Sequence, residues 1–324
     1  MKEIEIRPQN LFDKYIKLGK KDIQKYFSTT KLIPITCPAC SHKGTFAFSK
    51  FSFHYDECSK CKTLYVNPRP EKTAFDNYYS NSESSKFWAN EFYKITEKSR
   101  RNKIWQPKAK YISKKLKELG NIRSIVDIGG GYGIFIEEFK KLNNTVTPLI
   151  IEPSNQLAQI CKRKKIPVIC DFFENIDPKS LPQNKTLYTS FELFEHLHNP
   201  RLFLQKLFDT IKKNDIFLFT TLNGMGIDIQ VLWEKSKSVS PPHHLNFFNP
   251  KSIKKLLEKT GFKVLEISTP GKLDIDIMRN NIKDIDDKFW KNFLEHSSKK
   301  EQDTIQKYLR KNLLSSHMMI ICQK

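Results

Sequence analysis

The spacing of apolar and polar positions changes near residue 121. From there to about residue 270, short runs rich in β-branched and aromatic residues alternate with amphipathic stretches of helical period. This alternation is typical of βαβ units, whose strands form a parallel sheet. The runs are SIVDIG, TVTPLIIE, PVIC, KTLYTSF, DIFLFTTLN and FKVLEIS, and the C-terminal SSHMMIICQK predicts one more short strand.

Capping residues support the helices between these runs. Asn249 can cap a helix whose first position is Pro250, and Gly261 suits its left-handed end. Asn199 and Pro200 form the same kind of helix start. The second half of the chain is therefore expected to be an α/β domain.

The first 120 residues follow other patterns. Residues 1–30 are charged and loosely amphipathic, residues 31–70 are rich in Cys, Pro and aromatics, and residues 71–120 read mostly helical. We expect three parts: a lead-in with a small metal-binding module over 1–70, a helical connector or lid over 71–120, and the α/β domain over 121–324.

The composition of the chain is strongly basic, which bears on the partners that it could bind. The 324-residue chain has a formal net charge of +21 at pH 7. A basic excess favours anionic partners such as nucleic acid, nucleotide-sugars or anionic lipid surfaces, although scattered lysines are more simply explained as a solvated surface. The N-terminus lacks a signal-peptide core and no run is long enough to span a membrane, so we expect a cytoplasmic protein.

Four of the seven cysteines form two C-x-x-C pairs. They are Cys37 with Cys40 and Cys58 with Cys61, with seventeen residues between the pairs. Two such turns can direct four thiolates at one point, which predicts a closed, structural zinc site. Two disulfides or a redox pair are the alternatives, and a reducing compartment disfavours the first. The nearby His42 and His54 are expected to be loop residues.

A glycine loop follows the first predicted strand of the domain, in VDIGGGYGIF. The dinucleotide pattern G-x-G-x-x-G fails, because Ile134 stands where the third glycine would fall. Asp127 precedes the glycines, and a carboxylate there would attract a cationic amine instead of a pyrophosphate. The next strand ends in Glu152, an acid that could accept hydrogen bonds from two ribose hydroxyls. An adenosine ligand that carries an amino-acid cation fits both acids, and S-adenosylmethionine is such a ligand.

Over residues 121–270 the sequence resembles the class I S-adenosylmethionine-dependent methyltransferases. The resemblance implies that Asp127, Gly129 and Gly131 contact the cofactor and that Glu152 binds its ribose. It places Asp171 at the adenine amine and Phe172 against the adenine ring. It also implies that SFELFEHLHNP, which begins at Ser190 and includes Phe191, lines the methyl-transfer site.

The same resemblance implies a Rossmann-like, doubly wound α/β fold with a seven-stranded sheet. Its last strand would lie antiparallel beside the sixth, so that residues 271–314 form a helical insertion. Trp290, Phe293 and Leu294 of this insertion could pack on the domain or form a homodimer surface.

A cysteine-rich module before such a domain is similar to the arrangement in deoxysugar C-methyltransferases and in enzymes of glycan or secondary-metabolite clusters. The chain is too short for the large C-terminal domain of those C-methyltransferases, which places C-methylation in doubt. The resemblance therefore implies a role in polysaccharide biosynthesis, with a nucleotide-linked sugar or a glycan as acceptor.

A hydroxyl acceptor benefits from a general base. The candidates are His196, His243 and His244, with His198 nearby, and His196 comes first because ligands bind at the C-terminal edge of open α/β sheets. A role in orienting the loop is the plainer alternative for His196. Glu192 and Glu195 could belong to the same pocket, although a solvated helix start is the simpler interpretation.

Three functions follow. The first is methyl transfer to a small molecule, most simply to a hydroxyl of a sugar or glycan precursor. The second is RNA methylation, with the zinc module and the basic surface holding the backbone, although no N-P-P-[FY] motif follows the fourth strand and the module lacks a dense Arg-aromatic face. The third is a non-enzymatic zinc-ribbon adaptor, which the intact acid and glycine loop argue against.

Overall fold

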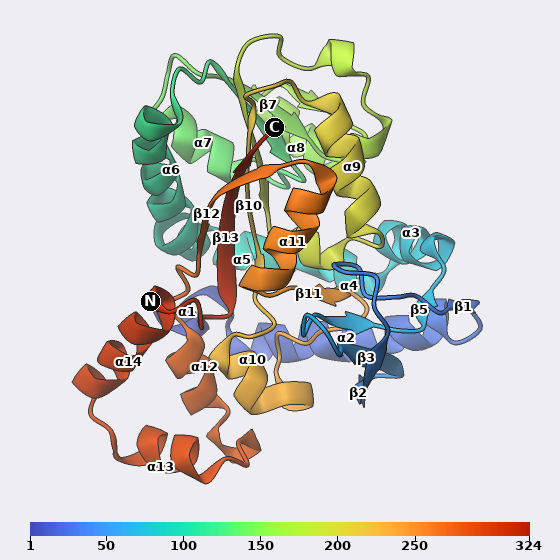
Figure 1. Cartoon of the computed structure of the whole chain (residues 1–324), viewed down its shortest axis with the longest axis vertical. Coiled ribbons are helices and arrows are strands. Elements are labelled where there is room, and N and C mark those ends of the chain that lie inside the picture. The colour runs from blue at the N-terminus through green and yellow to red at the C-terminus, as the bar shows by residue number, and fades with distance from the viewer.

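The computed structural model describes all 324 residues. Its centre is a seven-stranded sheet with the order β12-β13-β10-β9-β6-β7-β8 (Figure 1). Neighbouring strands from β10 to β8 run parallel, whereas β13 is antiparallel to both β10 and β12. The predicted α/β sheet and its antiparallel last strand are confirmed. The strands are β6 (Ser124–Ile128), β7 (Thr147–Ile151), β8 (Val168–Ile169), β9 (Thr186–Phe191), β10 (Ile216–Leu222), β12 (Lys263–Ser268) and β13 (His317–Gln323).

The two faces of the sheet are covered by different helices. Every residue of β6 and β9 is buried, which explains why these segments read as continuous apolar runs. One apolar cluster joins the sheet to α6 (Gln106–Leu119), α7 (Ile134–Lys140) and α8 (Asn155–Arg163). On the opposite face, α9 (Pro200–Thr210) and α11 (Pro250–Thr260) pack in a cluster that also includes Cys37, Cys40 and Cys58. The cysteine module therefore packs on the core of the α/β domain.

The module itself is a second, four-stranded antiparallel sheet of order β11-β4-β3-β2. Three strands come from the N-terminal region: β2 (Gly44–Lys50), β3 (Phe53–Cys58) and β4 (Leu64–Val66). The fourth, β11 (Asn246–Phe247), belongs to the α/β domain and pairs with Leu64 and Tyr65 of β4. A short ribbon of β1 (Leu32–Ile33) and β5 (Arg69–Pro70) closes the module.

Helices surround the C-terminal edge of the large sheet, in the lower half of Figure 1. The N-terminal α2 packs against α4, and α1 packs against α5. Residues 83–119 are helical almost throughout and contain two π-helical segments, Trp88–Phe92 and Arg101–Trp105. The remaining helices here are α1 (Glu3–Ile6), α2 (Gln9–Phe27), α3 (Lys72–Asn81), α4 (Glu83–Phe87), α5 (Tyr93–Arg100) and α10 (Ile227–Leu232).

The segment before the last strand is helical and has an apolar cluster of its own. Leu294 is buried in this cluster together with Leu232 of α10, and Trp290 and Phe293 pack against it. A dimer surface here stays a prediction. The helices are α12 (Asp274–Asn280), α13 (Lys288–His296) and α14 (Lys299–Lys311). Short 3-10 turns lie at Phe173–Asn175, Pro178–Ser180, Phe194–His196, Trp233–Lys235 and Ile282–Asp284. None of the helices has the length and apolar character that a membrane crossing requires.

Candidate active site

The glycine loop connects β6 to α7 at the C-terminal edge of the sheet. Gly129 and Gly131 have φ angles of +70° and +56°, a region that glycine enters at little cost. A Cβ on Gly131 would meet no atom within 4 Å, so this part of the loop borders open space. A Cβ on Gly129 would lie 3.3 Å from Cδ2 of Leu193. The segment after β9, which carries the candidate base, therefore packs directly on the glycine loop.

Asp127 is the next-to-last residue of β6, lies below this loop and is 2% exposed. Its Oδ1 accepts a hydrogen bond of 2.7 Å from the Thr189 hydroxyl on β9. Burial raises the pKa of Asp127 to about 7, against the opposing effects of that hydrogen bond and of the positive charge of Lys108. A carboxyl that is only partly ionised at neutral pH would be driven to its charged form by a bound ammonium group.

Glu152 lies at the end of β7, beside the loop. Its two oxygens accept hydrogen bonds of 2.9 Å from the backbone N–H groups of Gly131 and Ser154. Burial raises the pKa of this carboxyl, and these two hydrogen bonds oppose the effect. Each carboxylate oxygen has a further lone pair, so Glu152 can still accept hydrogen bonds from ribose hydroxyls.

Asp171 and Phe172 follow β8, the next strand along this edge. Oδ1 of Asp171 accepts hydrogen bonds of 2.7 Å from the N–H of Phe172 and from the amide of Asn175. The Phe172 ring is 51% exposed, with Nζ of Lys72 5.6 Å from its centroid. An exposed ring beside an acid suits contact with adenine, and both assignments stay predictions.

Phe191 lies in a different environment from Phe172. It is 8% exposed and packs edge-on against Phe135, with ring centroids 4.6 Å apart, and against Trp105 at 5.8 Å. Nζ of Lys108 lies 4.3 Å from its centroid. The ring contributes to the core on the α6 and α7 side, and a contact with the cofactor stays a prediction.

The three candidate histidines meet although 46 residues separate His196 from His243 along the chain. The His196 ring centroid lies 5.9 Å from that of His243 and 4.8 Å from that of His244. Nε2 of His243 is 2.6 Å from the Tyr78 hydroxyl, and its ring stacks on Tyr15 at 5.7 Å. His198 is separate, with its Nε2 2.9 Å from the carbonyl oxygen of Pro70.

Burial keeps this histidine cluster uncharged. It lowers the pKa of His196 well below its usual range, lowers that of His243 to about 3 and lowers that of His244 to about 4. For His196 and His243, repulsion from neighbouring rings adds to the effect. At neutral pH each imidazole is therefore uncharged, with one ring nitrogen that can accept a hydrogen bond or bind a metal ion.

Two acids extend the cluster. Glu195 is 1% exposed, so the expectation of a solvated helix start is wrong for this residue. The Thr221 hydroxyl donates to Glu195 at 2.9 Å, and burial together with the charge of Glu192 raises the Glu195 pKa to about 8. The sheet forces this burial, because Glu195 follows a central strand and Thr221 lies on the neighbouring one.

Lys108 and His317 were not identified from sequence. Nζ of Lys108 lies 4.0 Å from Glu192, and Nδ1 of His317 lies 3.4 Å from the same carboxylate. Burial lowers the pKa of Lys108, with the charges of Glu192 and Asp127 opposing the shift. Lys108 is one of many lysines in its helix, and no local pattern distinguishes it.

The four paired cysteines form one cluster of sulfur atoms within 4.8 Å of one another. The Cys37 and Cys61 sulfurs are 3.5 Å apart, and those of Cys40 and Cys58 are 3.4 Å apart. A hydrogen bond from the Cys37 thiol lowers the pKa of Cys61 to about 4. This donor set could bind one zinc ion, which takes four thiolates in a closed tetrahedron.

The α/β domain holds this module in place. The amide of Asn249 donates to the Cys61 carbonyl at 2.7 Å, and Arg201 donates to Ser41 at 2.8 Å. Arg69 of β5 is 2% exposed and donates to the backbone oxygen of His198 and to the side chain of Asn246. The module and the histidine segment are therefore parts of one hydrogen-bonded unit.

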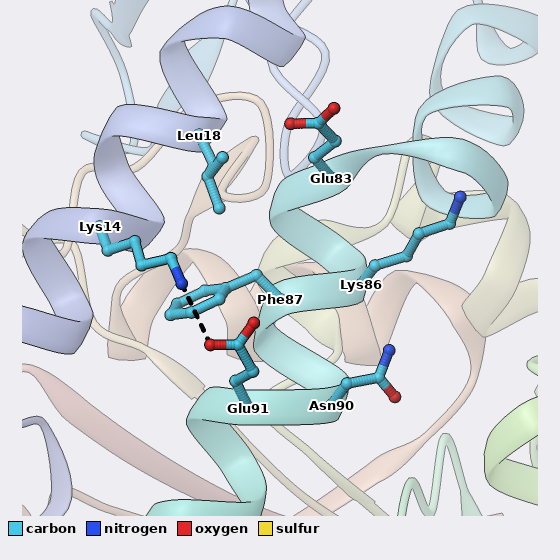
Figure 2. A pocket seen from close by; sticks show the side chains of 7 residues that line it. All are labelled: Lys14, Leu18, Glu83, Lys86, Phe87, Asn90 and Glu91. Atoms are coloured by element: carbon cyan, nitrogen blue, oxygen red, sulfur yellow. Dashed lines mark hydrogen bonds and ion pairs between the residues drawn. The ribbon is translucent and has the colours of Figure 1, made fainter.

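A separate surface hollow of about 330 Å³ lies between α2 and the helical stretch around α4. Figure 2 shows the ion pair of 3.1 Å between Lys14 and Glu91 that spans it. None of its lining residues belongs to the glycine loop or to the histidine cluster. They are Lys14, Leu18, Glu83, Lys86, Phe87, Asn90 and Glu91.

Comparison with known protein families gives a match over the middle of the chain. A family model described as a methyltransferase domain matches residues 96–267, more than half of the chain. No curated protein sequence matches the chain.

Several solved structures have a similar fold. The plantazolicin methyltransferase BamL, in complex with a triazolic desmethylPZN analog and SAH, is 15% identical, with 77% of this chain and 93% of that chain covered and a TM-score of 0.49. A SAM-dependent methyltransferase from Archaeoglobus fulgidus is 18% identical, with 72% and 100% covered and a TM-score of 0.45. An O-methyltransferase from a trans-AT PKS multienzyme of Brevibacillus brevis is 13% identical, with 72% and 76% covered and a TM-score of 0.46.

The acid and glycine loop, the second-strand acid and the antiparallel last strand thus occur together in a chain whose greater part matches a methyltransferase family. The chain belongs to the S-adenosylmethionine-dependent methyltransferase domain family.

Proposed function

We propose that the chain transfers a methyl group from S-adenosylmethionine to a hydroxyl of a small acceptor, such as a nucleotide-linked sugar or a glycan precursor. The observation that carries this proposal is the half-buried cluster of His196, His243 and His244, whose segment after β9 packs on the glycine loop through Leu193. Imidazoles at the C-terminal edge of the sheet place uncharged hydrogen-bond acceptors where open α/β sheets bind their ligands, within reach of an acceptor hydroxyl.

Residues along the edge of the sheet would each contact a different part of the cofactor. Phe172 and Asp171 would contact the adenine, Glu152 the ribose hydroxyls and Asp127 the amino-acid ammonium. The donor supplies an activated methyl on a positively charged sulfur, so the protein mainly has to align acceptor oxygen, methyl carbon and sulfur. The acceptor O–H bond and the sulfur–methyl bond break, an O–CH₃ bond forms, and His196 takes the hydroxyl proton.

The surroundings of the histidines favour a small acceptor over RNA. Tyr15 of α2 stacks on His243, and the Tyr78 hydroxyl of α3 is hydrogen-bonded to it, so helices from the N-terminal region lie directly over His243, next to His196. A nucleotide within a long chain would need these helices to move apart. The net charge of +21 leaves RNA as the second candidate, and the acceptor experiment includes it.

We further propose that the four cysteines bind a structural zinc ion. Both C-x-x-C turns have the same backbone design. Ser41 and Lys62, which directly follow the second cysteine of each pair, have positive φ angles of 65° and 58°. Four thiolates leave no open position, so the ion would hold the module and take no part in methyl transfer.

The test is transfer of a labelled methyl group to a panel of nucleotide-sugars and, in parallel, to total RNA. We expect label in the sugar fraction, and loss of that label in Asp127→Ala together with loss of cofactor binding. Label confined to RNA, with the steep salt dependence of phosphate contacts, would contradict the proposed acceptor. Unchanged cofactor binding in Asp127→Ala would contradict the proposed site.

A further inference from the structure

Three potential metal ligands converge at the edge of the sheet where the methyl acceptor is expected. One ligand atom each from Glu195, His196 and His244 lies within 4.8 Å of the other two. No imidazole nitrogen forms an ion pair with the Glu195 carboxylate at 4.0 Å or less, so no direct ion pair holds the group together. Metal–ligand bonds of about 2.1 Å separate two ligands by up to about 4.2 Å, so one ion could bridge them after a small side-chain adjustment.

The two segments that carry these ligands are fixed to each other by their backbones. The N–H of Leu245 donates to the Glu195 carbonyl at 2.8 Å. The Tyr55 hydroxyl, from β3 of the cysteine module, donates to the His244 carbonyl at 2.9 Å. The convergence of the side chains is therefore built into the fold and does not depend on contacts among the side chains themselves.

The hydrogen bonds around the ligands are those that metal sites use. Nδ1 of His244 is 2.6 Å from the carbonyl oxygen of Ser238, which can only accept, so Nδ1 carries the hydrogen and Nε2 keeps its lone pair. Ligating histidines generally donate their other ring N–H in this way, which fixes the tautomer and the ring orientation. The Thr221 hydroxyl similarly orients the Glu195 carboxylate.

The side chain of Glu195 has no cationic partner in the structure. Lys108 and His317 face Glu192, at 4.0 Å and 3.4 Å, whereas no basic side chain lies within 4.0 Å of Glu195. Two imidazoles and a carboxylate suit a divalent first-row transition metal ion, which would supply the missing positive charge.

We propose that Glu195, His196 and His244 bind a divalent transition metal ion at the acceptor side of the methyl-transfer site. Three protein ligands leave coordination positions open. Resting on the proposed function, we infer that these positions take oxygen atoms of the acceptor, which favours substrates with two neighbouring oxygens, such as a sugar diol. In the metal-bound protein His196 would be a ligand and would no longer act as the base, and the ion would instead lower the pKa of a bound acceptor hydroxyl.

The test is a titration of the full-length protein, with its cysteine-bound zinc retained, with Co²⁺ in the absence of methyl donor and acceptor. Calorimetry and visible absorption report the binding. We expect one Co²⁺ per chain with weak d–d bands and no thiolate-to-cobalt charge-transfer band. Glu195→Gln and His244→Ala should each weaken binding at least about tenfold. His54→Ala, which removes an exposed histidine on β3 of the cysteine module, should leave Co²⁺ binding unchanged.

Thermal melting identifies any variant that does not fold. If His244→Ala does not fold, the nearly isosteric Glu195→Gln decides whether these residues bind the metal ion. No Co²⁺ binding by the wild type, binding with the charge-transfer band of the cysteine site, or equal binding by the wild type and Glu195→Gln would each overturn the proposal. Because no methyl transfer is measured, these results are independent of the acceptor screen. Specific Co²⁺ binding with no methylated sugar would leave the metal site standing and remove only the proposed substrate.

Discussion

The cysteine cluster and the histidine–carboxylate cluster are both groups of potential metal ligands, and they differ in how the chain assembles them. The four cysteines lie in two short turns of the same backbone design within residues 37–61, and all four donors are thiols. The other cluster combines Glu195 and His196 with His244 from a distant loop, and it lies among further acids and histidines. Four thiolates would complete the coordination of one zinc ion, whereas the three ligands of the second cluster would leave coordination positions open.

This difference shows what each cluster can do. A complete set of four soft ligands can stabilise a fold but cannot bind a substrate through the metal. Leu193, close to the mixed cluster in the chain, packs on the glycine loop. The imidazole nitrogens and carboxyl oxygens of the cluster have lone pairs that can bind a metal ion or accept a hydrogen bond. The two are nevertheless connected, because β3 and β4 of the cysteine module hold His244 and β11. A change that destabilises the cysteine module should therefore also lower methyl transfer at the histidine–carboxylate cluster.

The largest effect is expected from a cysteine. Cys58→Ser leaves three thiolates and should lower the free energy of unfolding by several kcal/mol, a part of the roughly 10–16 kcal/mol that zinc contributes in small zinc domains. Because the module supports His244, methyl transfer should fall with it. Zinc content and thermal melting measure the change. Cys170→Ser, at an exposed cysteine outside the cluster, should keep both values; an unaltered melting temperature in Cys58→Ser would refute the structural role.

His196→Ala changes the histidine–carboxylate cluster and should affect methyl transfer without affecting the stability of the cysteine module. We expect the methyl-transfer rate to fall by roughly 10²–10⁴ because a proton acceptor or an acceptor-binding ligand is lost. Melting temperature and zinc content should stay close to those of the wild type. Isothermal titration with S-adenosylmethionine provides the control, since cofactor affinity should not change. A fall in affinity as large as the fall in rate would show that His196 serves the cofactor instead.

Asp127, which belongs to neither cluster, should control how folding stability and cofactor binding depend on pH. The pKa of Asp127 is raised to about 7 in the folded protein. The protonated side chain therefore contributes to folding stability. This contribution is fully present below the unfolded pKa of 3.8 and is lost as pH rises through 7. Without cofactor, Asp127→Asn should thus gain stability relative to wild type above pH 7, by up to about 4 kcal/mol.

The cofactor should reverse this preference, because its ammonium favours the ionised acid. Wild-type affinity for S-adenosylmethionine should increase up to about tenfold per pH unit between pH 6 and 7 and level off above. Asp127→Asn should bind more weakly at every pH, without this slope. Titrations at pH 6, 7 and 8 measure both; an equally steep slope in the variant would assign the titration to another group.

The smallest effect is expected at His54. The expectation that His54 lies in a loop is wrong, because it belongs to β3. Its Nδ1 lies 3.1 Å from the Ser49 hydroxyl on an exposed part of the module, and it is not among the clustered sulfur ligands. His54→Ala should change the free energy of unfolding by less than about 0.5 kcal/mol. Zinc content should be the same as in wild type. A loss of zinc would mean that the cluster needs a histidine and is not complete with four thiolates.

Features defined by short stretches were predictable from sequence. The paired cysteines, the apolar runs of the sheet, and Asp127 with the glycines all depend on residues a few positions apart, and local geometry decides what they can form. The burial of Glu195 was not predictable, because FELFEH reads equally well as a solvated helix start. Lys108 shows the same limit, since one lysine in a basic helix differs from its neighbours only by its position over Phe191.

The sequence by itself therefore determined the fold class, the cysteine cluster and the class of cofactor, through spacings that act over less than about one βαβ unit. Tertiary structure alone decided that β11 completes the cysteine sheet and that His244 reaches Glu195 and His196. The reason is physical: backbone geometry constrains neighbouring residues directly, whereas distant residues meet only where packing of the whole core brings their segments together.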